Sequence, residues 1–390
     1  MIASSDLIGL DERRTTSAVE KRSRVGVAGL GYWGPNLARN FHTLSGSQLV
    51  CCCDPSESAR RRAASTLPGV RMTDRFEDLL EDRDLDAIVL ATPVPSHGEL
   101  AVRVLEAGKH CLVEKPLAHN VEAALHAVRA AQRADRVLMV GHLLEYHPGV
   151  NKLRDLACTG ELGEVRCVYG NRLNLGKLRA DENALWSLGA HDVSVLLYIL
   201  DEEPCEVFAR GECYLRPTIE DVVFCYLRFP SGIAAHLHLS WLDPHKERRF
   251  TIVGSRRMAT FDDTATEGKL AIYDKGFDED SRSYGEYINR SGGMFCPQIT
   301  NVEPLRLECE HFLEAIQGGP APRSDGHSGL RVVRVLEQCQ EDLDQSRRSH
   351  SIRSAAVEES GHGPARGAVP ARVLGDDLER FAGHAGIASS

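Results

Sequence analysis

The feature that most constrains the fold is a glycine-rich turn near the amino end of the chain. Gly29, Gly31 and Gly34 follow the apolar segment VGVA and precede PNLARNF, which has the pattern of a helix. This GxGxxG spacing between a strand and a helix is typical of a nucleotide-binding turn. The first glycine permits the tight turn, the second lets a pyrophosphate approach, and the helix N-terminus stabilises the anion. The turn therefore predicts a βαβ unit that binds a dinucleotide.

A carboxylate after the next strand refines this prediction. Asp54 ends the segment SQLVCCCD, where it can accept hydrogen bonds from the adenosine ribose hydroxyls. The same charge would repel a 2′-phosphate, and no Arg follows Asp54 immediately. The sequence therefore favours NAD as the cofactor over NADP.

The order of strand and helix patterns predicts two domains. Residues 23–145 alternate strands with helices, which indicates an N-terminal Rossmann domain of the α/β class with a parallel sheet. Residues 146–350 hold strands in close succession, with a helix at about 185–200 and another late in the segment. They predict an α+β C-terminal domain with a large, mostly antiparallel open sheet. We expect residues 1–22 to form a flexible arm and residues 351–390, rich in Gly, Ala and Pro, to form a disordered tail.

Composition excludes several classes of protein. The formal net charge of −10 argues against a general binder of nucleic acid or membrane surfaces. No apolar run approaches the roughly 20 residues of a membrane span, and the first 22 residues lack the apolar core of a signal peptide. The 12 cysteines include no CxxC pair, so we expect no disulfide framework and a reducing cytoplasm. His236 and His238 alternate on one strand but are too few for a metal site, and none is expected.

The segment ATPVPSHGELAVRVLEAGKHCLVEKPLA indicates a family. In its ATP…H, AGKH and EKP elements, and in GLGYWGPN, the chain resembles the glucose–fructose oxidoreductase / inositol dehydrogenase (Gfo/Idh/MocA) family of NAD(P)-dependent sugar enzymes. The resemblance runs from about Arg24 to about Leu343. It implies a second set of cofactor-contacting positions around the glycine turn and these elements: Tyr32, Trp33, Thr92, Pro93, His97, Glu114 and Lys115.

The resemblance also implies a catalytic role for Lys115. In this family the EKP lysine lies beside the nicotinamide and the reacting sugar hydroxyl. A cation there stabilises the charge that develops on the oxygen. Glu114 can orient or balance this cation, and Pro116 fixes the backbone after it.

A histidine on the helix NALWSLGAHDVSVLLYIL is the second catalytic candidate. The family carries a histidine that touches the reacting hydroxyl, and the resemblance places it at His191. Its reference pKa near 6.5 suits proton transfer at neutral pH. Many members have an aspartate four residues earlier, where this chain has Ser187, and Asp192 points about 100° around the helix. Which group orients His191 therefore stays open.

Polar residues at the start of the second domain are candidates for substrate binding. The segment YGNRLNLGK is dense in amide and cationic groups, which suit a polyhydroxylated ligand that carries negative charge. Together with LWS…HD and SWLDPHKE, it resembles a subgroup that oxidises the C-3 hydroxyl of nucleotide-linked amino sugars or aminoglycoside precursors. Aromatic side chains could stack on the sugar or base, although core packing explains them equally well. The candidates are Tyr146, Asn171, Arg172, Asn174, Lys177, Trp186 and Asp192.

These expectations combine into an NAD-dependent sugar dehydrogenase. Hydride leaves C-3 for the nicotinamide, His191 or Lys115 takes the hydroxyl proton, and the other stabilises the oxyanion, which leaves a 3-keto sugar. The alternatives are the reverse ketosugar reduction, a glycosidase or isomerase that cycles NAD, and a non-catalytic dinucleotide sensor. The partner is a small-molecule sugar, without nucleic acid or membrane, and the resemblance implies a homodimer or homotetramer.

Overall fold

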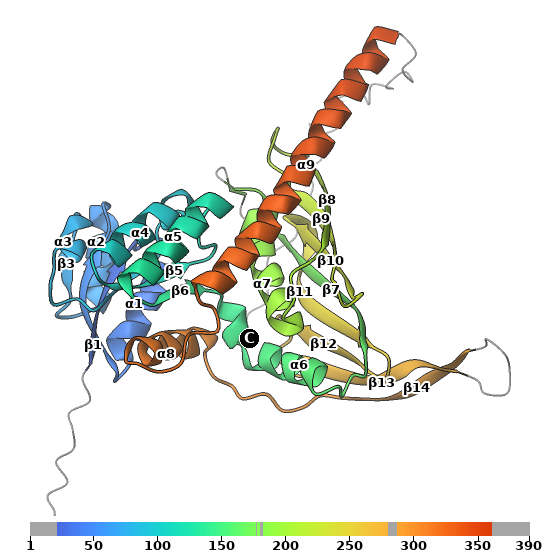
Figure 1. Cartoon of the computed structure of the whole chain (residues 1–390), viewed down its shortest axis with the longest axis horizontal. Coiled ribbons are helices and arrows are strands. Elements are labelled where there is room, and N and C mark those ends of the chain that lie inside the picture. The colour runs from blue at the N-terminus through green and yellow to red at the C-terminus, as the bar shows by residue number, and fades with distance from the viewer. Residues whose placement is uncertain (1–21, 177, 180–181, 280–286, 361–390) are drawn as a thin grey trace, which may run out of the picture. The chain divides into compact units, whose positions relative to one another are not determined.

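A computed structural model describes residues 22–176, 178–179, 182–279 and 287–360 of the chain (Figure 1). The first compact unit ends at Leu343, and the described residues after it belong to the long helix α9 (Gly326–Ser360). The segment 351–360, expected in the disordered tail, is helical in this structure. It contains Ala, Glu and Arg but no Gly or Pro, which favours helix. Residues 1–21 and 361–390 lie outside the described residues.

The N-terminal sheet is parallel throughout, as predicted. Its strand order is β3-β2-β1-β4-β5-β6, so the chain reverses its direction of travel across the sheet between β1 and β4. In such sheets a ligand binds at the carboxyl ends of the strands, beside this reversal. The strands are β1 (Ser23–Ala28), β2 (Ser47–Cys53), β3 (Arg71–Thr73), β4 (Ala87–Leu90), β5 (His110–Glu114) and β6 (Leu138–Gly141).

Side chains cap two helices of this domain, α2 and α5. The Asn120 side chain caps α5 by accepting a hydrogen bond from the Ala123 amide at 2.8 Å. Small residues such as Ala124 and Ala127 form its buried face, which lets α5 pack closely. The helices are α1 (Gly34–Thr43), α2 (Glu57–Thr66), α3 (Glu77–Leu80), η1 (Val94–Ser96), α4 (His97–Glu106) and α5 (Val121–Ala134).

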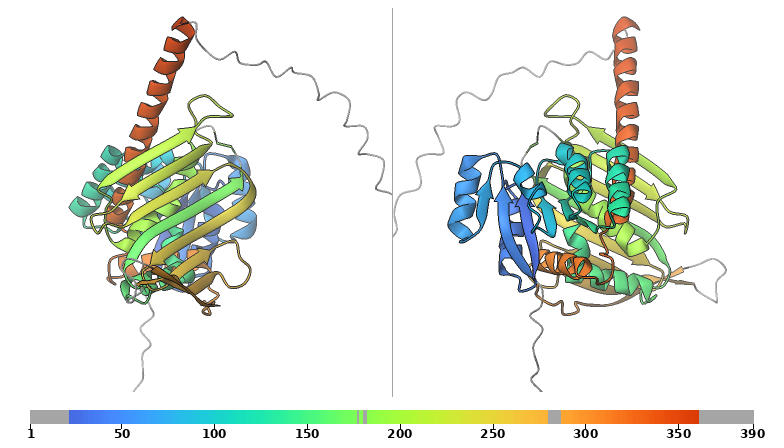
Figure 2. Two further views of the ribbon diagram at one scale, coloured as in Figure 1. Left: turned by 90° about the vertical axis from the view of Figure 1, so that its right-hand side faces the viewer. Right: turned by 60° about the vertical axis from the view of Figure 1, so that its left-hand side comes forward.

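The C-terminal sheet has the order β14-β13-β12-β11-β7-β10-β9-β8. All of its neighbouring strands are antiparallel except β7 and β10, which confirms a mostly antiparallel sheet. One broad face lacks helices and faces the viewer in the left panel of Figure 2. The strands are β7 (Val165–Leu175), β8 (Glu206–Glu212), β9 (Val222–Arg228), β10 (Ala234–Ser240), β11 (Leu242–Gly254), β12 (Met258–Asp262), β13 (Leu270–Glu279) and β14 (Tyr287–Phe295).

Helices lie on the other face of this sheet and connect it to the first domain. The π-helical turn η3 (Leu185–Gly189) leads directly into α7 (Ala190–Leu200), close to the helix expected at 185–200. η2 (Leu143–Tyr146) and α6 (Pro148–Cys158) follow β6. Most of the buried residues of α7 are apolar and join the core over the C-terminal sheet.

The Rossmann core takes side chains from far along the chain. On α8 (Pro304–Ile316), Phe312 is fully buried and packs edge-on against Phe41 of α1, with ring centroids 6.2 Å apart. On the other side of the sheet, Leu330 and Val333 of α9 join the core with α4 and α5. The first domain is therefore completed by residues beyond the expected boundary at 145.

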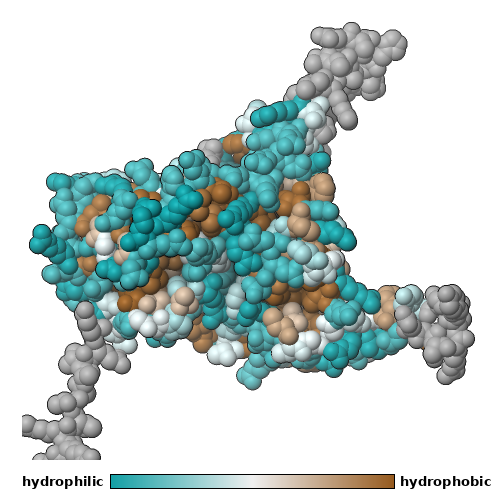
Figure 3. Space-filling model, in the orientation of Figure 1, coloured by the Kyte–Doolittle hydropathy of each residue, from teal (hydrophilic) through white to brown (hydrophobic). Residues whose placement is uncertain are grey.

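The surface is mixed in character. On the face shown in Figure 3, hydrophilic residues predominate and hydrophobic side chains show in patches between the elements. Within the described ranges, no helix combines the length and the apolar run needed to cross a membrane.

Candidate active site

The glycine turn joins β1 to α1 in a conformation that glycine alone fits. Gly29 has a φ of +93°, and a Cβ there would lie 2.4 Å from the carbonyl oxygen of Ala91. A Cβ on Gly34 would lie 1.8 Å from the carbonyl oxygen of Gly29. A Cβ on Gly31 meets nothing within 4 Å. Gly29 and Gly34 are thus required by the fold, whereas Gly31 faces the open space where a pyrophosphate could approach.

Asp54 is fastened to this turn. Its Oδ2 accepts a hydrogen bond from the Leu30 amide at 2.6 Å, and its Oδ1 accepts one from the Ser56 amide at 2.8 Å. Each carboxylate oxygen keeps a second lone pair that a ribose hydroxyl could use. The sequence argument missed Arg60 of α2, whose guanidinium donates to the Asp54 carbonyl at 2.6 Å. A cation therefore lies near Asp54 even though none follows it directly in sequence.

His97 connects the loop that contains Thr92 with the loop that contains Pro116. Its Nδ1 lies 2.7 Å from the Pro116 carbonyl oxygen and its Nε2 lies 2.8 Å from that of Thr92. Both ring nitrogens are engaged and the side chain is buried, so His97 positions the Thr92–Pro93 loop and offers no free nitrogen to a ligand. Burial lowers its pKa. Tyr32, in the glycine turn, is by contrast 90% exposed and lies stacked beside Trp33.

Lys115 links the two domains. Its Nζ donates a hydrogen bond of 3.0 Å to the carbonyl oxygen of Ser187, in the turn that leads into α7. The Lys115–Pro116 peptide is cis. Glu114 accepts a hydrogen bond from the Lys115 amide at 3.2 Å and another from the Trp33 side chain. The glycine turn, the EKP segment and the start of α7 are thereby brought together.

The surroundings of Lys115 have opposing effects on the pKa of its ammonium group. Burial lowers the pKa of its ammonium, whereas the carboxylates of Glu182 and Glu114 raise it. Glu182, which pairs with Arg179 at 3.0 Å, was not anticipated from the sequence. The sequence around it, RADENA, has no periodic pattern that would place Glu182 near the site.

His191 stands one turn after Ser187 in a cationic environment. Burial lowers the pKa of its imidazole well below the usual value, and the charges of Lys115 and Arg172 lower it further. The ring is therefore neutral at neutral pH and able to accept a proton. Its Nδ1 is buried and has no hydrogen-bond partner among the residues that the structure describes.

Two predicted substrate-binding residues pair with each other. Arg172 of β7 donates from Nε to Asp192 Oδ2 at 2.5 Å and from Nη2 to Asp192 Oδ1 at 3.2 Å. Both side chains are buried. This bidentate pair neutralises the charge of Asp192, so Asp192 does not orient His191. Asn171 likewise has a protein partner, because its amide donates to Glu247 at 2.9 Å.

The structure corrects one prediction about the substrate side. Tyr146 is 1% exposed, and its hydroxyl bonds to His311 Nδ1 at 3.1 Å and Ser324 Oγ at 3.2 Å. It belongs to the core because α8 covers it, so it cannot stack on a ligand. The half-buried Trp186 donates to Gln340 at 3.2 Å.

The other predicted substrate-binding residues are Asn174 and Lys177, and His236 and His238 form the histidine pair noted in the sequence. Asn174 has a buried Oδ1 without a partner in the described part of the chain, and Lys177 lies outside it. The rings of His236 and His238 stack on Tyr169 and Phe224. No group of three or more His, Cys, Asp or Glu within the described ranges is arranged to hold a metal ion.

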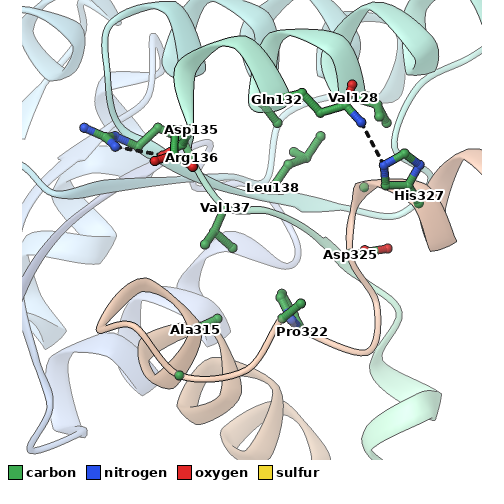
Figure 4. Close-up of a pocket in the computed structure, with 14 residues that line it drawn as sticks. Val128, Gln132, Asp135, Arg136, Val137, Leu138, Ala315, Pro322, Asp325 and His327 are labelled. Carbon is green, nitrogen blue, oxygen red and sulfur yellow. Dashed lines mark hydrogen bonds between the residues drawn. The ribbon is translucent and has the colours of Figure 1, made fainter.

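A separate hollow of about 390 Å³ lies at the other end of β6 (Figure 4). It is lined by residues of α5, of the start of β6, and of the chain that runs from the end of α8 into the start of α9. Gln132 of α5 and His327 of α9 are among them, and their side chains meet at 3.1 Å. Leu138 begins β6, whereas the site above lies where β5 and β6 end, so this hollow contains none of the predicted site residues.

Comparison with known families decides the assignment. Residues 23–142 match the model of an oxidoreductase family with an NAD-binding Rossmann fold, named GFO_IDH_MocA. Residues 150–260 match the model of the GFO/IDH/MocA C-terminal domain. The chain belongs to the Gfo/Idh/MocA family. It is thus an oxidoreductase, and its first domain is an NAD-binding Rossmann domain.

Several members of the family are similar over most of their length. The UDP-N-acetylglucosamine 3-dehydrogenase of Acidithiobacillus ferrooxidans is 28% identical over 316 residues, which is 81% of this chain and 95% of that protein. Its solved structure has a TM-score of 0.70 and covers 83% of this chain and 98% of its own. The NAD-dependent scyllo-inositol 2-dehydrogenase of Bacillus subtilis is 25% identical and covers 78% of this chain and 89% of its own. A structure of GenD2 from gentamicin A biosynthesis, in complex with NAD, shares the fold with a TM-score of 0.71 at 23% identity, covering 85% and 96%.

Proposed function

We propose that this family member is an NAD-dependent dehydrogenase that oxidises the C-3 hydroxyl of a sugar, with a nucleotide-linked amino sugar as the preferred class. The observation that supports this most is the bond between Lys115 Nζ and the Ser187 carbonyl, 3.0 Å long. It sets an ammonium group one helical turn before His191, at the carboxyl ends of the strands and beside the glycine turn. A hydroxyl placed there can meet an oxyanion stabiliser and a base together.

The residues divide the chemistry between them. When bound, NAD accepts the hydride from the carbinol carbon. The Gly31 opening and the N-terminus of α1 receive the pyrophosphate, and Asp54 accepts bonds from the ribose hydroxyls. His191, neutral because burial lowers its pKa, accepts the hydroxyl proton. The Lys115 ammonium stabilises the negative charge that develops on the oxygen.

The substrate class rests on the relatives. The Acidithiobacillus protein carries the name UDP-N-acetylglucosamine 3-dehydrogenase, and inositol dehydrogenases are similar to a comparable degree. The sugar or polyol class is therefore better supported than any single substrate, and an aminoglycoside precursor remains the second candidate within it. A non-catalytic sensor would not need the charge of Lys115 to act on His191, and this effect therefore supports an enzyme over a sensor.

The open face of the C-terminal sheet supports self-association into a homodimer or homotetramer. Phe208 of β8 and Phe224 of β9 are about half exposed, and Tyr226 lies beside Phe208 with ring centroids 6.3 Å apart. Exposed aromatic patches of this kind mark protein interfaces. We expect light scattering to give a mass at least twice that of the chain and Phe224→Lys to reduce it.

The reaction is tested directly. The protein is incubated with NAD and a panel of UDP-sugars, free amino sugars, aminoglycoside precursors and inositols, while NADH absorbance is followed and keto products are trapped. A keto product at C-3 of a UDP-amino sugar is the expected outcome. If NADH forms only with inositols, the substrate is a polyol rather than a UDP-amino sugar. If no alcohol in the panel yields NADH, the proposal that the protein is a dehydrogenase is wrong.

A further inference from the structure

Two arginines face each other across the paired strands β7 and β11. In the register of this pair, Arg172 of β7 is aligned with Arg248 of β11. Phe250 and Ile252, two and four residues further along β11, are buried in the core that α7 shares. Because side chains alternate along a strand, Arg248 and Arg172 lie on this same face of the sheet. Like charges directly opposite each other destabilise a sheet, so this arrangement needs a compensating reason.

This face of the sheet also holds the helix of the catalytic histidine. Arg172 donates to both carboxylate oxygens of Asp192, the residue after His191, through Nε and Nη2. Lys115 reaches the turn η3, directly before the same helix, through its bond to a main-chain carbonyl there. Arg248 is therefore aligned with the side chain that holds the start of α7. Consistent with this position, its charge is among those that lower the pKa of His191.

The two arginines differ in how far their charges are neutralised. Arg172 has a bidentate carboxylate partner, and its side chain is only 9% exposed. The side chain of Arg248 is 40% exposed, and within the described residues it makes a single bond, of 3.2 Å, from Nη1 to Asp263 Oδ2. The Nζ atom of Lys269 lies 3.7 Å from the other oxygen of that carboxylate. One carboxylate cannot neutralise two cations, so Arg248 keeps positive charge on the accessible part of its guanidinium.

An unused hydrogen-bond acceptor lies on the same face of β7. Asn174 is two residues after Arg172, so its side chain points to the same side of the sheet. Its Oδ1 is buried and has no hydrogen-bond partner in the described part of the chain. Buried polar atoms are normally hydrogen-bonded, so an acceptor without a donor suits a ligand that supplies one. A sugar hydroxyl or an N-acetyl amide group is such a donor.

Together these groups suit a ligand that is both hydroxylated and anionic. A guanidinium presents several N–H groups in one plane, which matches the oxygens of a phosphate. In a nucleotide-linked sugar a phosphate is bonded directly to the sugar, whereas a free sugar or an inositol offers no charge to Arg248. The pyrophosphate of NAD is placed above at the glycine turn of the first domain, so an anion at Arg248 would come from the substrate.

We propose that Arg248 binds a phosphate group of the substrate and thereby selects phosphorylated sugars, nucleotide-linked sugars above all, over free sugars and polyols. The proposal rests on the proposed function and names the residue that sets its substrate class. Asn174 accepts a hydrogen bond from the sugar, which orients the ring beside the catalytic pair. No bond to phosphorus is made or broken, because the hydride still leaves the carbinol carbon for NAD and the hydroxyl proton still goes to His191.

The first test requires no turnover. UDP is titrated by calorimetry into the full-length protein that is already saturated with NAD, so that UDP cannot report on the dinucleotide site. We expect UDP to bind at least about tenfold more weakly to Arg248→Ala than to the wild type. Arg248→Lys should fall between them, because lysine keeps the charge but not the planar fork. If the wild type does not bind UDP, or if Arg248→Ala binds it equally well, the proposal is wrong, whatever the sugar panel shows.

The matched control is Arg249→Ala. Arg249 is the next residue of β11, so it lies on the open face of the sheet, where its Nη2 pairs with Asp262 at 3.2 Å. Its loss should leave UDP binding unchanged. N-acetylglucosamine 1-phosphate is titrated in the same way to identify the source of the phosphate. We expect it to bind more weakly than UDP-N-acetylglucosamine and to depend on Arg248 as well, and equal binding of the two would make the selected class sugar phosphates in general.

The second test compares substrates with and without a phosphate. NADH formation is measured with UDP-N-acetylglucosamine and with the free sugar or polyol that the panel turns over fastest, at a pH where wild-type activity has reached its plateau. Arg248→Ala should raise KM for the UDP-sugar by about tenfold or more and leave kcat within a few-fold, because it removes a binding contact rather than a reacting group. For the uncharged substrate kcat/KM should stay within a few-fold of the wild-type value.

A purely structural role for Arg248 predicts a different pattern. If Arg248 serves only to hold Asp263, then Asp263→Asn should weaken UDP binding as much as Arg248→Ala does, because both changes break the same ion pair. Our proposal predicts the opposite, since Asp263→Asn removes a competing anion and should leave UDP binding as tight as in the wild type or tighter. Equal losses with charged and uncharged substrates in Arg248→Ala would also contradict the proposal. If Arg248→Ala does not fold, Arg248→Lys and Asp263→Asn decide by the same titration.

Discussion

The ammonium of Lys115 bonds to the main-chain carbonyl of Ser187, 72 positions further along the chain, at 3.0 Å. This contact joins the end of β5 to the turn that starts α7. It holds the lysine with a backbone atom, so the contact does not depend on which side chain stands at position 187. Because Ser187 lies one helical turn before His191, the contact also leads to a testable prediction about how Lys115 and His191 act together.

Lys115→Ala and His191→Ala should each reduce kcat by on the order of a hundredfold or more, because each removes one positioned acid/base or oxyanion group. NAD affinity should stay within a few-fold, since the pyrophosphate and adenosine ribose contacts proposed for NAD lie at the glycine turn and Asp54. The double variant should lose much less than the product of the single losses, because the two groups act on one hydroxyl. Steady-state kinetics and separate NAD titrations measure these effects.

Lys109→Ala is a matched control for Lys115. Lys109 lies at the other end of β5, where its ammonium bonds to the carbonyls of Asp82 at 2.5 Å and Leu85 at 3.0 Å. The Lys109→Ala variant should be less stable than the wild type, but its kcat should stay within a few-fold of the wild-type value. Fully multiplicative losses in the double variant would mean that Lys115 and His191 act on different steps.

Gly31→Ala and Gly34→Ala should separate ligand binding from folding. The added methyl at Gly34 meets the Gly29 carbonyl at 1.8 Å, so this variant should lose about 1–3 kcal/mol of stability or more. At Gly31 the methyl meets nothing within 4 Å, so thermal stability should stay normal while NAD binds at least about tenfold more weakly. Calorimetry and NAD titration provide the two measurements. Normal NAD affinity in Gly31→Ala would place the pyrophosphate elsewhere.

The choice between NAD and NADP should depend on Asp54 and Arg60. We expect NAD to bind more than tenfold more tightly, which is about 1.4 kcal/mol. Asp54→Ser should narrow this gap because it removes the like charge, and Arg60→Ala should widen it because it removes a nearby cation. Tighter binding of NADPH than of NADH to the wild type would reverse the assignment.

The acid limb of kcat/KM should lie below pH 6.5, the reference pKa of histidine, because burial and nearby cations lower the pKa of His191. Activity should therefore persist as pH falls through 6.5 and decline only where His191 gains its proton. Lys115→Ala removes a positive charge, so its remaining activity should decline at a higher pH. Arg248 of β11 also lowers the pKa of His191, but by less than Lys115 does, so Arg248→Ala should shift the limb in the same direction by a smaller amount. If the acid limb of Lys115→Ala lies at the same pH as that of the wild type, the limb reports a group other than His191.

Glu308→Gln should change how stability depends on pH. The folded pKa of Glu308 lies well above its unfolded value of about 4.3, so its contribution is complete below that value and is lost as pH rises toward the folded pKa. Relative to the wild type, the variant should gain up to about 1.4 kcal/mol for each pH unit above about 4.3, until the pH reaches the folded pKa of Glu308. Urea unfolding at several pH values tests this. A difference that stays constant with pH would show that Glu308 is ionised in the folded protein.

Local signals explain what the sequence predicted correctly. The glycine turn, the alternation of strands and helices, and the helix after residue 185 each depend on residues close together in the chain. By contrast, the segment YINRSGGMF, which forms β14, contains two glycines and little strand periodicity, so its local pattern does not indicate a strand. The parallel pairing of β7 with β10 depends on distant segments, which no local pattern encodes.

The site was harder to predict where residues meet across the fold. Arg172 and Asp192 both suit a sugar ligand, yet they neutralise each other because β7 runs beside α7. Tyr146 has an amphipathic ring that suits a ligand, but α8 and Ser324 bury it. In each case the partner lies far away in sequence, so composition and spacing cannot reveal it.

The packing of α8 on the first domain limits how this enzyme can be recombined with its relatives. Phe312 is fully buried against Phe41, so residues 23–145 alone would expose an apolar surface that the folded chain never shows to water. A chimaera that exchanges only this segment would inherit a mismatched α8 from the other parent. An exchange of the whole nucleotide-binding segment between family members would therefore keep this core intact only if residues 304–333 were transferred with it.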